Sequence, residues 1–148
     1  MAHFATTVKS SLDAAAAFDL LANFESITDW DPGISEAQRL DAGELRVGSA
    51  FRLVAVFGLR RLVLTYVIKE IEPGQRVVLE ASNGEFTSYD VITVAPAQSG
   101  CTVTYDATLS LHGWRRPADP LLQVAFLVVG KRAEAGLRKA LNPTATSA

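Results

Sequence analysis

The stretch TVTYDATLSL, residues 102–111, alternates strictly between two kinds of side chain. One face carries Val103, Tyr105, Ala107, Leu109 and Leu111, and the other carries Thr102, Thr104, Asp106, Thr108 and Ser110. Such alternation is typical of an antiparallel strand with one face on a core and the other in water. Because one sheet cannot bury its apolar face alone, the stretch predicts a second layer that covers it.

The same period of two extends back from this strand to about residue 34. It predicts five further strands, at about residues 34–41, 49–57, 61–72, 76–82 and 87–95. The breaks between them contain turn residues, such as Pro73-Gly74, Asn83-Gly84 and Ser99-Gly100. Connections this short join antiparallel neighbours, so we expect one continuous antiparallel meander.

The inward faces of these strands follow from their apolar positions. We expect the following side chains to point inward: Phe51, Leu53, Ala55, Phe57, Leu62, Leu64, Tyr66, Ile68, Val77, Leu79 and Ala81. The strand at 87–95 allows two alternatives, because Tyr89 and Val91 lie on one face and Asp90 and Ile92 on the other. We favour the alternative that leaves Asp90 as an ordinary outward charge. In the other alternative Asp90 lies in apolar surroundings, which raise the pKa of a carboxyl group.

Helical periodicity precedes the meander. After a short strand at residues 3–9, apolar residues at spacings of three and four predict a helix over 12–24, and a second short turn covers 25–29. Pro32-Gly33 then ends the regular structure. Asp29 and Asp31 flank Trp30, and we interpret these two carboxylates as caps of a helix end and a turn rather than as an acid–base pair.

A long helix closes the chain, from about residue 118 to residue 141, with an apolar stripe at spacings of three and four. Its first half, residues 121–129, is apolar on nearly every side. A single helix on a single sheet has one solvent-exposed face, so some of these apolar side chains lack a partner in the core. They line a cavity, cover a dimer interface or touch a membrane surface. We favour cavity lining with partial burial in a dimer.

The order of elements predicts an α+β fold. We expect a curved antiparallel sheet of about six to seven strands wrapped around the long C-terminal helix, with two short helices after the first strand. A strongly curved sheet around one helix need not close fully, and the gap becomes a cavity. We predict a single domain over residues 1–142 and a flexible C-terminal tail over 143–148.

Composition excludes several classes of function. The chain has 148 residues, of which 49% are hydrophobic, and a formal net charge of −2, so we expect no binding of nucleic acid. A single cysteine and two histidines leave little material for a metal site, and no nucleotide or cofactor fingerprint is present, so we expect no cofactor. No segment approaches the roughly 20 apolar residues that span a bilayer. We therefore expect a cytoplasmic protein without stable membrane insertion.

Three segments resemble a known superfamily. They are FESITDWDP at 24–32, IEPGQR at 71–76 and GCTVTY at 100–105, and they occur in the same order of elements as in the polyketide cyclase/dehydrase and START-like superfamily. The resemblance covers roughly residues 4–141 and implies the helix-grip fold of the birch-pollen allergen. It also implies binding of hydrophobic or amphipathic molecules between sheet and helix. No catalytic residue carries over.

The leading hypothesis is a non-enzymatic protein that binds or carries a small hydrophobic molecule of lipid, polyketide or aromatic type. We expect its cavity to be lined by Trp30, Phe51, Leu53, Tyr66, Leu79, Tyr105, Leu122, Phe126 and Val129. Tyrosine hydroxyls in an apolar pocket orient a ligand. One alternative is a polyketide cyclase- or dehydratase-like enzyme that moves protons with Asp90, Tyr66 or Tyr105. Another is a structural or regulatory homodimer without a ligand.

Overall fold

The computed structural model describes residues 2–57, 59–113 and 119–143, but not the side chains of 57, 119–122 and 124–126. Its strands are β1 (Ala2–Ser10), β2 (Ile34–Arg39), β3 (Ala50–Phe57), β4 (Arg60–Glu72), β5 (Arg76–Ser82), β6 (Phe86–Ala97) and β7 (Gly100–Leu111). The helices are α1 (Ala14–Ala22), the 3-10 helix η1 (Phe24–Asp29) and α2 (Asp119–Leu141). Of the predicted tail over 143–148, all but Pro143 falls outside the described residues.

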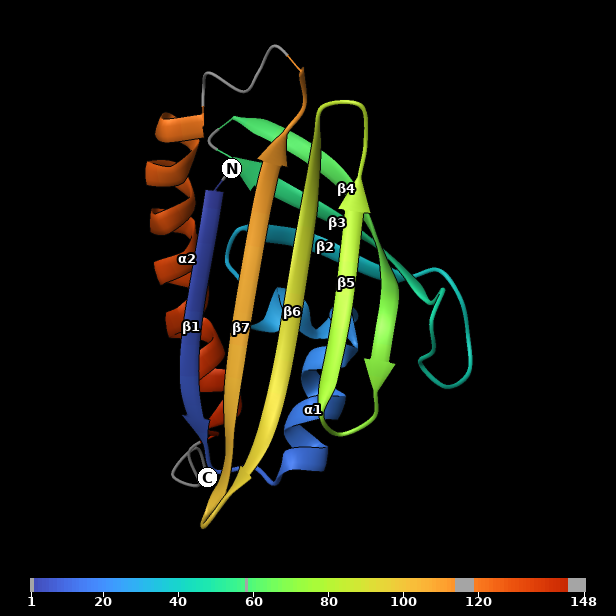
Figure 1. Ribbon diagram of the computed structural model, residues 1–148, viewed down its shortest axis with the longest axis vertical. Helices are drawn as coiled ribbons and strands as arrows, with labels where there is room; N and C mark the ends of the chain where they lie inside the picture. The colour runs from blue at the N-terminus through green and yellow to red at the C-terminus, as the bar shows by residue number, and fades with distance from the viewer. Residues whose placement is uncertain (1, 58, 114–118, 144–148) are drawn as a thin grey trace.

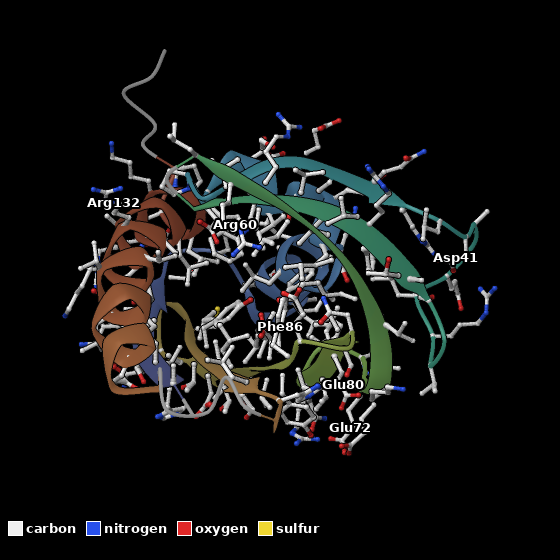
Figure 2. The ribbon with its side chains drawn as sticks, turned by 90° about the horizontal axis from the view of Figure 1, so that it is seen from above. Asp41, Arg60, Glu72, Glu80, Phe86 and Arg132 are labelled. Carbon is white, nitrogen blue, oxygen red and sulfur yellow. The ribbon has the colours of Figure 1, made fainter. Side chains whose placement is uncertain are left out.

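The described strands form one antiparallel sheet in the order β1-β7-β6-β5-β4-β3-β2. The sheet curls around its inner face, and α2 lies beside β1 across the open side, while α1 and η1 occupy one end of the concave space (Figure 1). Seen from above, the strands enclose a central space that α2 borders on one side (Figure 2). This is the predicted helix-grip architecture.

The side chains predicted to point inward from β3, β4 and β5 are buried or partly buried, except that of Phe57, which lies outside the described residues. The burial of β6 resolves the open alternative. Ser88, Asp90, Ile92 and Val94 are buried, whereas Tyr89 is 36% exposed. The favoured outward orientation of Asp90 is therefore wrong. The physical reason is the register of the β6–β7 hairpin, which pairs Asp90 with Ala107 on the inner face.

Short hydrogen bonds fix the ends of the helices. The side chain of Asp13 caps α1 by accepting from the Ala16 N–H at 2.7 Å. At the other end of the chain, the hydroxyl of Ser10 donates to the carbonyl of Leu141 at 2.6 Å, which ties the end of β1 to the end of α2. The last turns of α2 are packed inward, with Leu137 and Leu141 fully buried.

Two glycines let α2 approach its neighbours closely. A Cβ at Gly136 would lie 1.7 Å from the carbonyl oxygen of Trp30, and a Cβ at Gly130 would lie 2.5 Å from the ring of Phe4. Only a residue without a side chain fits at such distances. Further toward the start of α2, Leu127 and Val128 are 43% and 51% exposed, so part of the apolar half predicted for this helix has no core partner in the monomer.

Candidate ligand cavity

A cavity of about 370 Å³ lies between the inner face of the sheet and α2. Its apolar lining comes from every layer of the fold: Phe4, Ile27, Trp30, Ile34, Leu53, Val56, Leu62, Leu64, Phe86, Ala107, Leu109, Leu111, Val129, Ala133 and Leu137. Figure 2 shows Phe86 within the central space. The walls are thus built by strand residues together with residues of η1 and α2.

The cavity brings together five of the nine predicted lining residues. The five that line it are Trp30, Leu53, Tyr66, Tyr105 and Val129. The side chains of two others, Leu122 and Phe126, lie outside the described residues.

Phe51 and Leu79 do not line the cavity. Both are fully buried in the packed core, where the ring of Phe51 lies 6.0 Å from that of Phe24 in η1. Their inward direction was predicted correctly, but α1 and η1 fill the space in front of that end of the sheet. An inward direction therefore does not by itself place a residue beside empty space.

The polar side of the cavity is a chain of hydrogen bonds that joins β4, β6 and β7. The Tyr105 hydroxyl donates to Asp90 Oδ2 at 2.5 Å, and the Ser88 hydroxyl donates to Asp90 Oδ1 at a longer 3.4 Å. The hydroxyls of Tyr66 and Ser88 lie 2.7 Å apart. All four side chains line the cavity and are buried. We refer to Tyr66, Ser88, Asp90 and Tyr105 as the Asp90 chain.

Burial governs the electrostatics of the Asp90 chain. Desolvation raises the pKa of Asp90 to about 7, although the hydrogen bonds from Tyr105 and Ser88 act in the opposite direction. The charges of Asp31 and Asp106 add to the increase. The pKa values of Tyr66 and Tyr105 are raised well above their usual range, again chiefly by burial. Near neutral pH, Asp90 therefore exists in both its neutral and its ionised form.

Trp30 and Asp31 form the wall next to η1. The Trp30 ring packs edge-on against the Tyr105 ring at a centroid distance of 5.6 Å. Its indole N–H is buried and has no hydrogen-bond partner among the described residues. Asp31 accepts from the Gly33 N–H at 2.8 Å, as expected for a turn cap, and also lines the cavity. Burial raises the pKa of Asp31, and the bond from Gly33 acts in the opposite direction.

Charged side chains also lie at the edges of the cavity. Glu134 of α2 accepts a hydrogen bond from the Thr6 hydroxyl of β1, and both line the cavity. Glu85 and Arg60 contribute to the lining as well, and Figure 2 shows Arg60 on the α2 side of the molecule. Arg60 is the only cationic side chain among the described lining residues.

Sequence reasoning missed Ser88 and the inward position of Asp90. One available signal would have found both. The turn predicted at Ser99-Gly100 sets the β6–β7 register, in which Ala97 pairs with Gly100 and only two residues connect the strands. Counting back along the hairpin places Ser88 opposite Leu109 and Asp90 opposite Ala107, on the face predicted to point inward.

A family model described as polyketide cyclase / dehydrase and lipid transport matches residues 1–142. The chain belongs to this family. The family relationship and the cavity agree on the general role of binding a small ligand or acting on one, but the description leaves the choice between the two open. No curated protein matches the sequence significantly.

Solved structures show the same fold at low sequence identity. A START superfamily protein from Mycobacterium smegmatis matches with a TM-score of 0.76 and 12% identity, covering 94% of this chain and 96% of that one. The Zhui aromatase/cyclase from Streptomyces sp. R1128 matches with a TM-score of 0.71 and 12% identity, covering 94% and 90%. A protein from Thermus thermophilus matches with a TM-score of 0.75 and 14% identity, covering 95% of each chain. At these identities the likeness establishes the fold of this family member alone.

The described residues contain neither a cluster of metal ligands nor a membrane-spanning helix. Within residues 2–57, 59–113 and 119–143, no group of three or more His, Cys, Asp and Glu side chains is arranged to hold a metal ion. In the same part of the chain, no helix has the length and apolar character needed to cross a membrane.

Proposed function

We propose that the protein binds a small, mainly hydrophobic molecule with one oxygen-bearing end in the cavity between the sheet and α2. The observation that carries this proposal is the distribution of side chains around about 370 Å³ of space, with apolar residues on most walls and the Asp90 chain at one place. Apolar walls with a few convergent polar groups are the usual composition of a small-molecule site.

The volume limits the size of the ligand. Small-molecule pockets occupy roughly 300–1,000 Å³. At about 370 Å³ this cavity lies near the lower end of that range, which favours a compact molecule of a few fused rings over a long-chain lipid. The rings of Trp30, Tyr66, Phe86 and Tyr105 line the space and suit an aromatic or polycyclic ligand.

Calorimetric titration with naphthalene derivatives tests the proposal. We expect micromolar affinity, about −8 kcal/mol, with a negative change in heat capacity because apolar surface is buried. Ala107→Phe places a ring in the cavity and is expected to reduce affinity at least tenfold, about 1.4 kcal/mol. Thr108→Phe is the matched control, because the next residue of β7 lies on the opposite face. Equal binding by both variants would contradict the cavity as the site.

The second candidate function is proton transfer to a bound carbonyl compound, as in a cyclase or dehydratase. It is favoured by Asp90, whose pKa of about 7 allows the carboxyl to give or take a proton near neutrality. In this function the neutral Asp90 chain polarises a carbonyl oxygen, and Asp31 accepts the proton released from the neighbouring carbon.

Hydrogen–deuterium exchange at the methyl group of acetylnaphthalene, followed by NMR in heavy water, tests this second function. We expect the protein to accelerate the exchange and Asp31→Asn, which removes the proton acceptor, to abolish the acceleration. Asp29→Asn, at an exposed carboxyl of η1, is the matched control. Binding of acetylnaphthalene without accelerated exchange would leave the protein as a binder alone.

A further inference from the structure

The Asp90 chain has a fixed supply of hydrogens. Its three hydroxyl groups, on Tyr66, Ser88 and Tyr105, have one hydrogen each. When Asp90 is ionised, Tyr105 and Ser88 both donate to it, so Tyr66 must donate to Ser88. Every hydroxyl hydrogen is then used within the chain, and none is left for a ligand.

Protonation of Asp90 adds a fourth hydrogen to the same three hydrogen bonds. The bonds can be kept if one of them reverses direction, for example with Asp90 donating to Tyr105. One hydrogen is then left without an acceptor inside the chain. Buried donors without an acceptor are unfavourable, so this hydrogen needs a partner.

The free hydrogen belongs to a group that lines the cavity, because all members of the Asp90 chain line it. Asp31 is another lining acid and raises the pKa of Asp90, but its carboxylate accepts from the Gly33 N–H at 2.8 Å and forms no hydrogen bond with the Asp90 chain among the described residues. The neighbouring Trp30 indole N–H is itself a donor and cannot serve as the acceptor. An acceptor supplied by the ligand satisfies the free hydrogen.

We propose that Asp90, through its protonation, sets the specificity of the cavity for ligands with a carbonyl-type acceptor oxygen, and that such ligands bind with uptake of protons. This proposal rests on the proposed function and adds to it the class of polar group that the ligand carries. A ketone, ester or quinone accepts one hydrogen bond and brings no donor that needs a partner of its own. A hydrocarbon of the same shape occupies the apolar walls equally well but leaves the free hydrogen unpaired.

The charges around Asp90 allow it to be neutral in the working range. Asp31, which follows η1, and Asp106 on β7 both favour the neutral form of Asp90. The other charged side chains of the lining are Glu134 of α2, Glu85, which directly precedes β6, and Arg60 of β4. Burial raises the pKa of Asp90 to about 7, so a change of pH near neutrality switches the hydrogen supply of the chain.

The test compares acetylnaphthalene with ethylnaphthalene, which has the same ring system and carbon chain but lacks the acceptor oxygen, in calorimetric titrations of the wild-type protein. Between about pH 6 and about pH 9, we expect the affinity for acetylnaphthalene to fall about three- to tenfold as Asp90 ionises, while the affinity for ethylnaphthalene changes little. Titrations in buffers of different ionisation enthalpy should show uptake of a few tenths of a proton for acetylnaphthalene alone near about pH 7.5.

Asp90→Asn sharpens the test, because an asparagine amide keeps donor hydrogens at every pH. We expect this variant to bind acetylnaphthalene with an affinity independent of pH and with no proton uptake. Asp29→Asn is the control and should keep the wild-type pH profile. The proton uptake of the wild-type protein decides the question even if Asp90→Asn folds poorly.

The outcomes separate the two proposals. If both naphthalenes bind with the same pH profile and the same proton count, the specificity proposal is overturned while the proposed function stands. The same conclusion follows if Asp90→Asn retains the pH dependence. If neither compound binds, and Ala107→Phe does not weaken the binding of any other naphthalene derivative, both the proposed function and this inference are overturned.

Discussion

The inner face of β7 runs from a packed end to a hollow end. Val103 is fully buried at the packed end, together with Phe24 and Phe51, and α1 and η1 cover this part of the sheet. Ala107, Leu109 and Leu111 continue the same alternation toward the hollow end, but they border the cavity and are only partly buried. The same pattern of residues therefore serves two purposes, and the covering element decides which. At the packed end it stabilises the fold, and at the hollow end it forms the wall of the cavity.

The largest effect is expected from truncating a residue of the packed end. Phe51→Ala should lower the free energy of unfolding by about 3–5 kcal/mol, because it empties a fully buried aromatic site. Leu109→Ala is the counterpart at the hollow end and should lose less than about 2 kcal/mol, because this side chain already borders empty space. Urea unfolding of both variants measures the difference. Equal losses of unfolding free energy would mean that side chains fill the space around Leu109 in solution.

The second prediction concerns the pH dependence of stability through Asp90. Its pKa is raised to about 7 in the folded protein, so the folded state binds the proton more tightly than the unfolded state does. Stability from this group is fully present below the unfolded pKa of about 3.9 and is lost as the pH rises through about 7. Asp90→Asn should therefore be more stable than wild type at about pH 8, by on the order of 3 kcal/mol.

Unfolding experiments at several pH values, together with NMR titration of the Asp90 carboxyl, check this expectation. At about pH 4, where the wild-type carboxyl is neutral in the folded state, the advantage of the asparagine variant should be much smaller. An Asp90 pKa near the reference value of about 3.9 would contradict both the electrostatic argument and the proton-linked specificity.

The third prediction compares a phenylalanine ring introduced at the packed end with one introduced at the hollow end. Ala17 of α1 is fully buried against the sheet, so Ala17→Phe should destabilise the protein by about 1–3 kcal/mol through overpacking. Ala107→Phe places its ring in the cavity and should change stability by less than about 1 kcal/mol. Thermal and urea unfolding check the pair. A large loss for Ala107→Phe would show that the hollow end cannot accept a ring.

The smallest effect is expected from removing one hydroxyl of the Asp90 chain. Tyr105→Phe should lower stability by about 1 kcal/mol, the usual net value of a hydrogen bond. Because the lost bond favours the ionised carboxylate, the pKa of Asp90 should rise further. NMR titration of Asp90 in this variant measures the direction in which its pKa changes. A lower pKa than in the wild-type protein would contradict the hydrogen bond from Tyr105 to Asp90.

The sequence predicted the fold because alternation and turn residues act locally. β3, β4, β5 and β7 show their inward faces in their own residues, and short turns leave an antiparallel meander as the arrangement of β3 to β7. The site was predicted only in part. Local pattern does not tell how far along the sheet α1 and η1 reach, which is why Phe51 and Leu79 were placed in the cavity although they lie in the packed core.

Asp90 shows a second limit of local reasoning. Both faces of β6 contain apolar residues, so its own pattern could not decide the orientation, and propensity favoured an exposed carboxylate. The decision depends on the register with β7, which the hairpin turn sets. The Asp90 chain depends on three registers at once, because Tyr66 is on β4, Ser88 and Asp90 are on β6 and Tyr105 is on β7, and β5 lies between β4 and β6.

The backbone contact at Gly136 has a consequence for how a ligand enters. The carbonyl of Trp30 sits where a side chain of α2 would be, so the second half of the helix and the wall that contains Trp30 are interlocked. The bond from Ser10 to Leu141 secures the same half. Leu127 and Val128 are exposed further toward the start of α2, away from this interlocked half, so we expect a guest molecule to exchange with solvent there more readily than past Gly136.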